Sequence, residues 1–320
     1  VGELGKMRVE KAYQVLQKTD IAIIVIDASI GETAEDAAIL AEIQKRSIPY
    51  IIVKNKADLT QKQDGENEIF VSAKTGENIS VLKERIAALA PKGEKKRRII
   101  GDLLEPNDFV VLVVPIDSAA PKGRLILPQQ QTIRDILEAG ANAIVVRDSE
   151  LQETLVSLGK RPRLVIMDSQ IFGKVSKIVP EDIPLTSFSI LMARYKGNLE
   201  QNVKGARALE QLKNGDTVLI SEGCTHHRQC EDIGTVKLPR WIREYTGKEL
   251  QFQFTSGGTF PADLSPYALI VHCGGCMLNE KEMQHRLSIA KEQNAKMTNY
   301  GICIAYIHEI LERSLAPLGL

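Results

Sequence analysis

Two short segments that contain cysteine and histidine constrain this 320-residue chain most. The first is Cys224-Thr225-His226, and the second, 45 residues further on, is His272-Cys273-Gly274-Gly275-Cys276. Each follows an apolar run, at residues 216–220 and 267–271, and is therefore predicted to be a loop at the carboxyl end of a buried strand. Because such loops converge at one edge of a parallel sheet, where ligands usually bind, we expect the two segments to form one site.

The cysteines of these segments indicate a metal site. Cys273 and Cys276 enclose two glycines and can point at one ion or cluster, and Cys224 supplies a third thiolate from the other loop. An iron-sulfur cluster held by three cysteines fits this pattern, and a zinc site completed by histidine remains an alternative. Cys303 is predicted to be a buried thiol rather than a ligand.

Composition and charge exclude several functions. Lys and Arg together number 41, as do Asp and Glu, so no net charge attracts nucleic acid or an anionic membrane. No apolar run reaches the roughly 18 residues of a membrane span, and no signal-peptide pattern is recognised at Val1. Five cysteines, an odd number spaced as metal ligands, predict a reducing, cytoplasmic compartment rather than a disulfide framework.

The first 90 residues contain a second, independent signal. Residues 21–27 and 50–53 are β-branched runs typical of parallel strands covered on both faces, and the helical pattern between them predicts a βαβ unit. Asn55-Lys56-Ala57-Asp58 follows the second strand, and Ser72-Ala73-Lys74 follows a third at residues 69–71. These two segments resemble the NKxD and SAK base-recognition motifs of Ras-like GTPases.

The resemblance to Ras-like GTPases implies a guanine site. Asp58 is expected to accept hydrogen bonds from N1 and N2 of guanine. Asn55 and the backbone N–H of Ala73 would help to recognise the base, and Lys56 would pack along the ring. Ser72 and Lys74 complete the predicted nucleotide-binding residues. The phosphate-binding pattern G-x-x-x-x-G-K-S/T does not occur. We therefore expect the chain to be cut within its GTPase domain and inactive by itself, with Mg²⁺ and GTP bound by the full-length protein.

The chain is predicted to be an α/β protein of three domains. A charged, Pro- and Gly-flanked run at residues 91–98 reads as a solvated linker, because no aromatic residues interleave it. Apolar runs and helical patterns alternate again on either side of residue 182, and helices are expected over residues 280–293 and 305–314. The predicted domains are residues 1–92, 93–182 and 183–320.

The cysteine segments also carry a family resemblance. Together with Glu231-Asp232-Ile233-Gly234, Leu238-Pro239-Arg240-Trp241 and Thr298-Asn299-Tyr300-Gly301, they resemble the HydF family, the scaffold GTPases of [FeFe]-hydrogenase maturation, over nearly the whole chain. The resemblance implies a [4Fe-4S] cluster held by Cys224, Cys273 and Cys276, and the family motif does not use Cys230. It leaves the fourth, exchangeable ligand open among His226, His272 and Glu231.

The HydF resemblance also implies what each domain does. Residues 1–92 would be a partial GTP-binding domain, 93–182 a homodimerisation domain, and 183–320 the cluster-binding domain with a parallel sheet. The implied function is a scaffold that takes a di-iron precursor as cargo and delivers it to apo-[FeFe]-hydrogenase, with the radical-SAM maturases of the pathway as further partners. The alternatives are a zinc-stabilised GTPase regulator and an iron-sulfur electron-transfer protein. A redox enzyme should carry a second cofactor motif, and the absence of G-x-G-x-x-G after a strand favours the scaffold.

Overall fold

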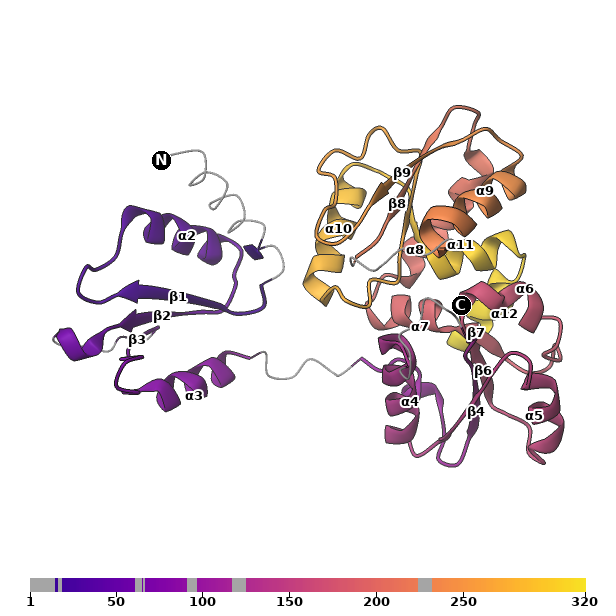
Figure 1. The fold of residues 1–320 in the computed structure, drawn as a ribbon, viewed down its shortest axis with the longest axis horizontal. Coiled ribbons are helices and arrows are strands. Elements are labelled where there is room, and N and C mark those ends of the chain that lie inside the picture. The colour runs from indigo at the N-terminus through magenta and orange to yellow at the C-terminus, as the bar shows by residue number, and fades with distance from the viewer. Residues whose placement is uncertain are drawn as a thin grey trace. The chain divides into compact units, whose positions relative to one another are not determined.

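The computed structural model describes residues 15–16, 19–60, 65, 67–90, 97–116, 125–223 and 232–320. The chain divides into two compact units, residues 1–96 and 97–320. The described residues form three sheets, and every strand pair in them is parallel. The predicted α/β class is therefore confirmed (Figure 1).

The first unit contains a three-stranded sheet in the order β1-β2-β3. Its elements in chain order are β1 (Ala22–Asp27), α2 (Ala34–Lys45), β2 (Tyr50–Asn55), β3 (Glu68–Phe70) and α3 (Ile79–Leu89). Ile52 of β2 packs toward α2 and Ile51 toward α3, so both faces of this strand are buried. This two-sided burial explains the unbroken apolar run in β2 and confirms the predicted βαβ unit.

The second unit contains two four-stranded sheets. The central sheet has the order β5-β4-β6-β7, and the C-terminal sheet has the order β11-β10-β8-β9. The first part of the unit is built from β4 (Phe109–Val113), α4 (Leu127–Glu138), β5 (Asn142–Val146), α5 (Leu151–Ser157), β6 (Leu164–Met167), α6 (Phe172–Val175), β7 (Leu185–Ser187) and α7 (Phe188–Tyr195). The rest is built from α8 (Leu199–Ala206), β8 (Thr217–Ser221), α9 (Leu238–Thr246), β9 (Gln251–Thr255), β10 (Leu269–His272), α10 (Glu280–Glu292), β11 (Met297–Asn299), α11 (Tyr300–Ile307) and α12 (Leu311–Leu315).

The change from the central to the C-terminal sheet falls later than the boundary expected between residues 182 and 183. Strand β7 pairs with β6, with Val165 opposite Leu185. The strand expected after residue 184 is therefore present but joins the central sheet, because the pattern of so short a strand does not show which sheet it pairs with. The central sheet thus extends to Ser187.

Helices cover both faces of each sheet in the second unit. Figure 1 shows α10 on one side of the C-terminal sheet and α9 and α11 on the other, and α4 and α5 on opposite sides of the central sheet. Among the described residues, no helix combines the length and the apolar character needed to cross a bilayer.

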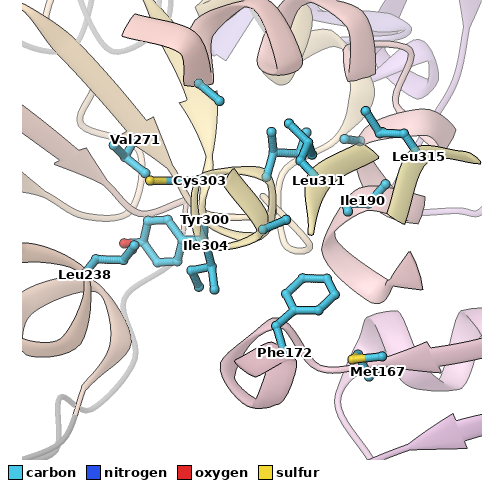
Figure 2. Close-up of a cluster of buried hydrophobic side chains, with 14 of the residues drawn as sticks. Met167, Phe172, Ile190, Leu238, Val271, Tyr300, Cys303, Ile304, Leu311 and Leu315 are labelled. Carbon is cyan, nitrogen blue, oxygen red and sulfur yellow. The ribbon is translucent and has the colours of Figure 1, made fainter. Parts of the chain in front are cut away.

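One hydrophobic core joins the two sheets of the second unit. It contains Val111 and Val165 from the central sheet, Val218 and Val271 from the C-terminal sheet, and Cys303 of α11 between them. Figure 2 shows this arrangement around α11, with Val271 and Tyr300 toward one sheet and Phe172 and Met167 toward the other. The shared core holds residues 97–320 as one compact unit and fixes the carboxyl ends of the strands that lead into the cysteine segments.

Candidate metal centre

The two cysteine segments follow neighbouring strands. Strands β8 and β10 pair in parallel, with Ser221 opposite His272 at their carboxyl ends. The backbone N–H of Cys273 continues this pairing by donating to the Ser221 carbonyl at 2.9 Å. The prediction that both segments leave the same edge of a parallel sheet is confirmed.

A direct hydrogen bond links the beginnings of the two loops. The backbone N–H of Gly223 donates to Cys273 Sγ at 3.0 Å. A Cβ atom on Gly223 would lie 2.7 Å from Cγ of Leu278 in the second loop, so only glycine permits this approach. Cys224 is the next residue in the chain and lies, with His226 and Glu231, outside the described residues.

The second loop is a tight connection between β10 and α10. Gly275 adopts a left-handed conformation (φ +58°), and its backbone N–H donates to Cys273 Sγ at 3.3 Å. A Cβ atom on Gly275 would lie 2.8 Å from Sδ of Met283. The loop ends at Asn279, whose side chain accepts from the Glu282 N–H at 2.9 Å and caps α10. The loop conformation therefore depends on Gly275 and holds the Cys273 sulfur in place.

The described cysteines fall into two chemical environments. Cys273 and Cys276 are partly exposed, whereas Cys303 is fully buried in α11. Burial raises the pKa of Cys273, and the N–H donors of Gly223 and Gly275 oppose that shift by stabilising the thiolate. Burial raises the pKa of Cys303 to about 12, so this thiol stays protonated at neutral pH. Its expected burial is confirmed.

Both ring nitrogens of His272 are engaged by the protein. The ring is 1% exposed, and Arg286 Nη1 lies 2.9 Å from Nε2 while Nδ1 lies 2.6 Å from the Cys273 carbonyl oxygen. Because a guanidinium can only donate, Nε2 is the acceptor and Nδ1 carries the proton. Burial lowers the pKa of His272 to about 3. Coordination of a metal by His272 would require one of these contacts to break.

Arg286 is a buried charge that the sequence reading missed. Its Nη2 pairs with Glu282 at 2.8 Å and donates to the Gly257 carbonyl at 3.0 Å. The residue lies in α10 on the same stripe as Met283 and Leu287, both buried. In the sequence, burial of Arg286 is indicated by its helical spacing among apolar residues of the core-facing side of the helix.

Lys196, at the end of α7, lies beneath the second cysteine loop. The residue is 6% exposed, and its ammonium group donates to the carbonyls of Gly275 and Leu278, the latter at 3.1 Å. Burial lowers the pKa of Lys196, and the negative charges of Cys276, Cys273 and Glu280 oppose that shift. No sequence pattern marks this lysine, since a lysine at a helix C-terminus usually faces solvent.

A buried acid lies near Cys273. Glu222 follows β8 directly, is buried, and accepts a hydrogen bond from the Tyr300 hydroxyl at 3.3 Å. Burial and the nearby Glu222 charge raise the pKa of Tyr300, so the phenol remains a donor. A charged residue immediately after an apolar strand and two residues before Cys224 was a signal that the sequence reading overlooked.

These side chains suit a thiolate-bound, anionic metal group. Two cysteines lie on one glycine-containing loop, two N–H groups point at one of the sulfurs, and a buried ammonium group lies beneath. Within the part of the chain that the structure describes, no three His, Cys, Asp or Glu side chains are grouped to hold a metal ion. Completion of the site thus depends on the segment that contains Cys224.

The first unit brings the two predicted base-recognition motifs together. Asn55 Oδ1 accepts from the Ala73 backbone N–H at 3.0 Å, and the Ser72 hydroxyl donates to Asp58 Oδ1 at 2.7 Å. The Ala57 N–H also bonds to the Val71 carbonyl at 3.0 Å. These contacts hold a carboxylate and a backbone segment side by side at the carboxyl edge of the sheet.

The two lysines of these motifs differ in their surroundings. Lys56 has a left-handed backbone (φ 67°), and its Nζ lies 2.6 Å from Asp27 Oδ2 at the end of β1. Hydrogen bonds from Lys56 and Ser29 lower the pKa of Asp27 to about 2. Lys74 is exposed beside Ala73. The ion pair positions the Lys56 stem across the carboxyl ends of β1 and β2.

The fold and site define a multidomain α/β protein with a cysteine-containing loop at the edge of a parallel sheet, and comparison with known proteins identifies the family. Residues 99–197 match the hydrogen maturase F dimerization domain, and residues 200–317 match the hydrogen maturase F tetramerization domain. Together the two domain models cover about two thirds of the chain. The chain belongs to the hydrogen maturase F (HydF) family.

Part of the chain is also similar to curated GTPases. The tRNA modification GTPase MnmE of Prochlorococcus marinus is 31% identical over 107 residues, which make up 30% of this chain and 23% of that protein. MnmE of Laribacter hongkongensis is 31% identical over 98 residues, 28% of this chain and 22% of that protein. The chain thus spans less than a quarter of the length of these relatives.

Proposed function

We propose that the protein is a scaffold of hydrogenase maturation that holds a [4Fe-4S] cluster on Cys224, Cys273 and Cys276. The observation that carries this proposal is the hydrogen bond from Gly223 to Cys273 Sγ, which joins the two cysteine segments at the edge of one sheet. Membership of the HydF family supports the maturation role.

The protein's own residues would prepare the site for the cluster. The Gly223 and Gly275 N–H groups stabilise the Cys273 thiolate, and Gly275 sets the loop that carries Cys276. The cluster, when bound, supplies an iron with an exchangeable fourth position, at which a di-iron precursor is expected to dock. Candidates for that fourth ligand are His226 and Glu231, together with His272 if it leaves Arg286.

Self-association and nucleotide binding complete the proposed function. The family's dimerization and tetramerization domains support assembly into a homodimer or a larger homo-oligomer. Asp58, held by Ser72, would accept guanine donors in the full-length protein, where GTP turnover would gate delivery of the precursor to apo-[FeFe]-hydrogenase. The radical-SAM maturases of the pathway are the proposed sources of that precursor.

Anaerobic reconstitution with iron and sulfide tests the cluster assignment. We expect a brown protein with about four irons and four sulfides per chain, in keeping with a cubane held by three cysteines. Parallel incubation with zinc gives the comparison. A colourless protein that retains one zinc and no iron would contradict the scaffold proposal and favour the zinc-stabilised alternative.

A further inference from the structure

Lys196 is an unusual residue to find beneath a cysteine loop. Lysine is almost never fully buried without a charged partner, because removal of its ammonium group from water is costly. In this protein it is 6% exposed, and within the described residues its ammonium group donates to two backbone carbonyls, those of Gly275 and Leu278. Those acceptors are neutral, and the negative charges that act on the ammonium group are those of Cys276, Cys273 and Glu280.

The position of Lys196 is fixed from both sides. Its backbone N–H bonds to the Met192 carbonyl at 3.0 Å at the end of α7, and Gln284 of α10 donates to its carbonyl at 2.9 Å. A Cβ atom on Gly275 would lie 3.6 Å from Nζ, so the ammonium group lies against the bend between Cys273 and Cys276. This geometry directs the charge at the loop that carries two of the three cysteines.

We propose that Lys196 is the counter-charge of the metal centre, which stabilises an anionic cluster and raises its reduction potential. This inference rests on the proposed function. Three thiolates and a [4Fe-4S] core carry a net negative charge that increases by one on reduction, so a buried cation stabilises the reduced state more than the oxidised state. Lys196 lies within the residues that match the dimerization domain, and Gly275 and Leu278 lie within those that match the tetramerization domain. The hydrogen bonds of Lys196 therefore link the two matched segments.

The test is a redox titration of the reconstituted full chain, monitored by electron paramagnetic resonance and visible absorption. Lys196→Gln retains N–H donors for the loop carbonyls and removes the charge, whereas Lys196→Met removes both. Lys204→Gln, at an exposed site on α8, removes a charge that solvent screens. We expect both Lys196 variants to have a more negative midpoint potential than wild type, and Lys204→Gln to match wild type.

The outcomes separate this inference from the proposed function. If wild type holds the cluster and Lys196→Gln has an unchanged midpoint potential, Lys196 only supports the loop. The counter-charge proposal is then wrong, whereas the proposed function is unaffected. If both variants fold, by circular dichroism, but bind no iron, Lys196→Arg decides: iron binding restored by arginine supports the counter-charge, and its continued loss overturns it. A wild-type protein that binds no iron would overturn both proposals.

Discussion

The backbone N–H of Gly223 lies 3.0 Å from the sulfur of Cys273 and donates a hydrogen bond to it, across 50 residues of sequence. The contact exists because β8 and β10 are neighbours in the sheet and end at the same level. It orients one sulfur before any metal binds. A preorganised ligand of this kind lowers the cost of assembling a cluster.

Replacement of Cys224, Cys273 or Cys276 by serine is expected to abolish iron retention, because three thiolates are needed to hold the cube. Iron per chain after reconstitution is the measurement. The matched control is Cys303→Ser, since Cys303 is a buried, protonated thiol in α11 and should keep the cluster while the protein loses some stability. Equal loss of iron in Cys303→Ser or Cys230→Ser would show that the ligand assignment is wrong.

Gly275→Ala should destabilise the second loop, whereas Gly274→Ala should not. The left-handed backbone of Gly275 costs an L-residue about 1–2 kcal/mol, and the added methyl group would also press on Met283. Among the described residues, apart from the two chain neighbours, no atom lies within 4 Å of a Cβ placed on Gly274. Denaturant unfolding of the apo-protein and iron content after reconstitution measure the effect. Equal stability of the two variants would contradict this account of the loop.

The convergence of the cysteine segments could be predicted from the sequence because it depends on strands alone. The apolar runs before each segment identified β8 and β10, and neighbouring parallel strands must bring their carboxyl ends to one edge. The base-recognition motifs were predictable for the same reason, since Asn55 and Ser72 also follow strands. Strand β9, whose residues are mostly exposed, was missed because Gln251 to Thr255 lack a buried apolar run.

The charged residues around the cysteines could not be predicted in this way. Lys196 follows α7, which packs into the shared core, and Arg286 belongs to α10, which packs into a separate core of the C-terminal sheet. The helical pattern alone does not show which charged side chain such a core encloses. The burial of both residues depends on tertiary contacts between segments that are distant in sequence. The helix expected over residues 305–314 is divided into α11 and α12, because Glu309 adopts a left-handed backbone (φ 58°) and the Ile310 N–H donates back to the Ala305 carbonyl at 3.0 Å, which ends α11.

Asp102→Asn should weaken the attachment of α7 and so lower the free energy of unfolding, and the size of this decrease should depend on pH. Arg194 Nη1 donates to Asp102 Oδ1 at 2.9 Å, and Arg194 lowers the pKa of that carboxyl group. Because the Asp102 side chain is 43% exposed, solvent screening limits the expected loss to about 0.5–1 kcal/mol at neutral pH. A carboxyl group with a lowered pKa stabilises the fold above its unfolded pKa of 3.8, and this contribution is lost as pH falls through the lower folded value. Unfolding of both proteins from pH 7 downward checks this, and a difference that grows in acid would contradict it.

Asn55→Ala should loosen the junction of the two base-recognition motifs. The variant removes the acceptor of the Ala73 N–H, a contact of 3.0 Å. A net loss of about 0.5–1.5 kcal/mol corresponds to roughly two- to tenfold faster amide exchange at Ala73. Hydrogen–deuterium exchange measures it, and Lys74→Ala is the control, because Lys74 is the exposed neighbour. Unchanged exchange in Asn55→Ala would show that the contact does not hold the motifs together.

His272→Gln should retain the cluster and leave its electron paramagnetic resonance spectrum close to that of wild type. The reason is the occupation of both ring nitrogens, Nε2 by Arg286 and Nδ1 by the Cys273 carbonyl. The exchangeable ligand is therefore expected from the segment that contains His226 and Glu231, and substitution of one of those should alter the spectrum. Arg286→Met provides the matched test, because it frees Nε2 without removing the imidazole. If His272→Gln changes the spectrum as a lost ligand would, and Arg286→Met does not, then His272 leaves its protein contacts to bind iron.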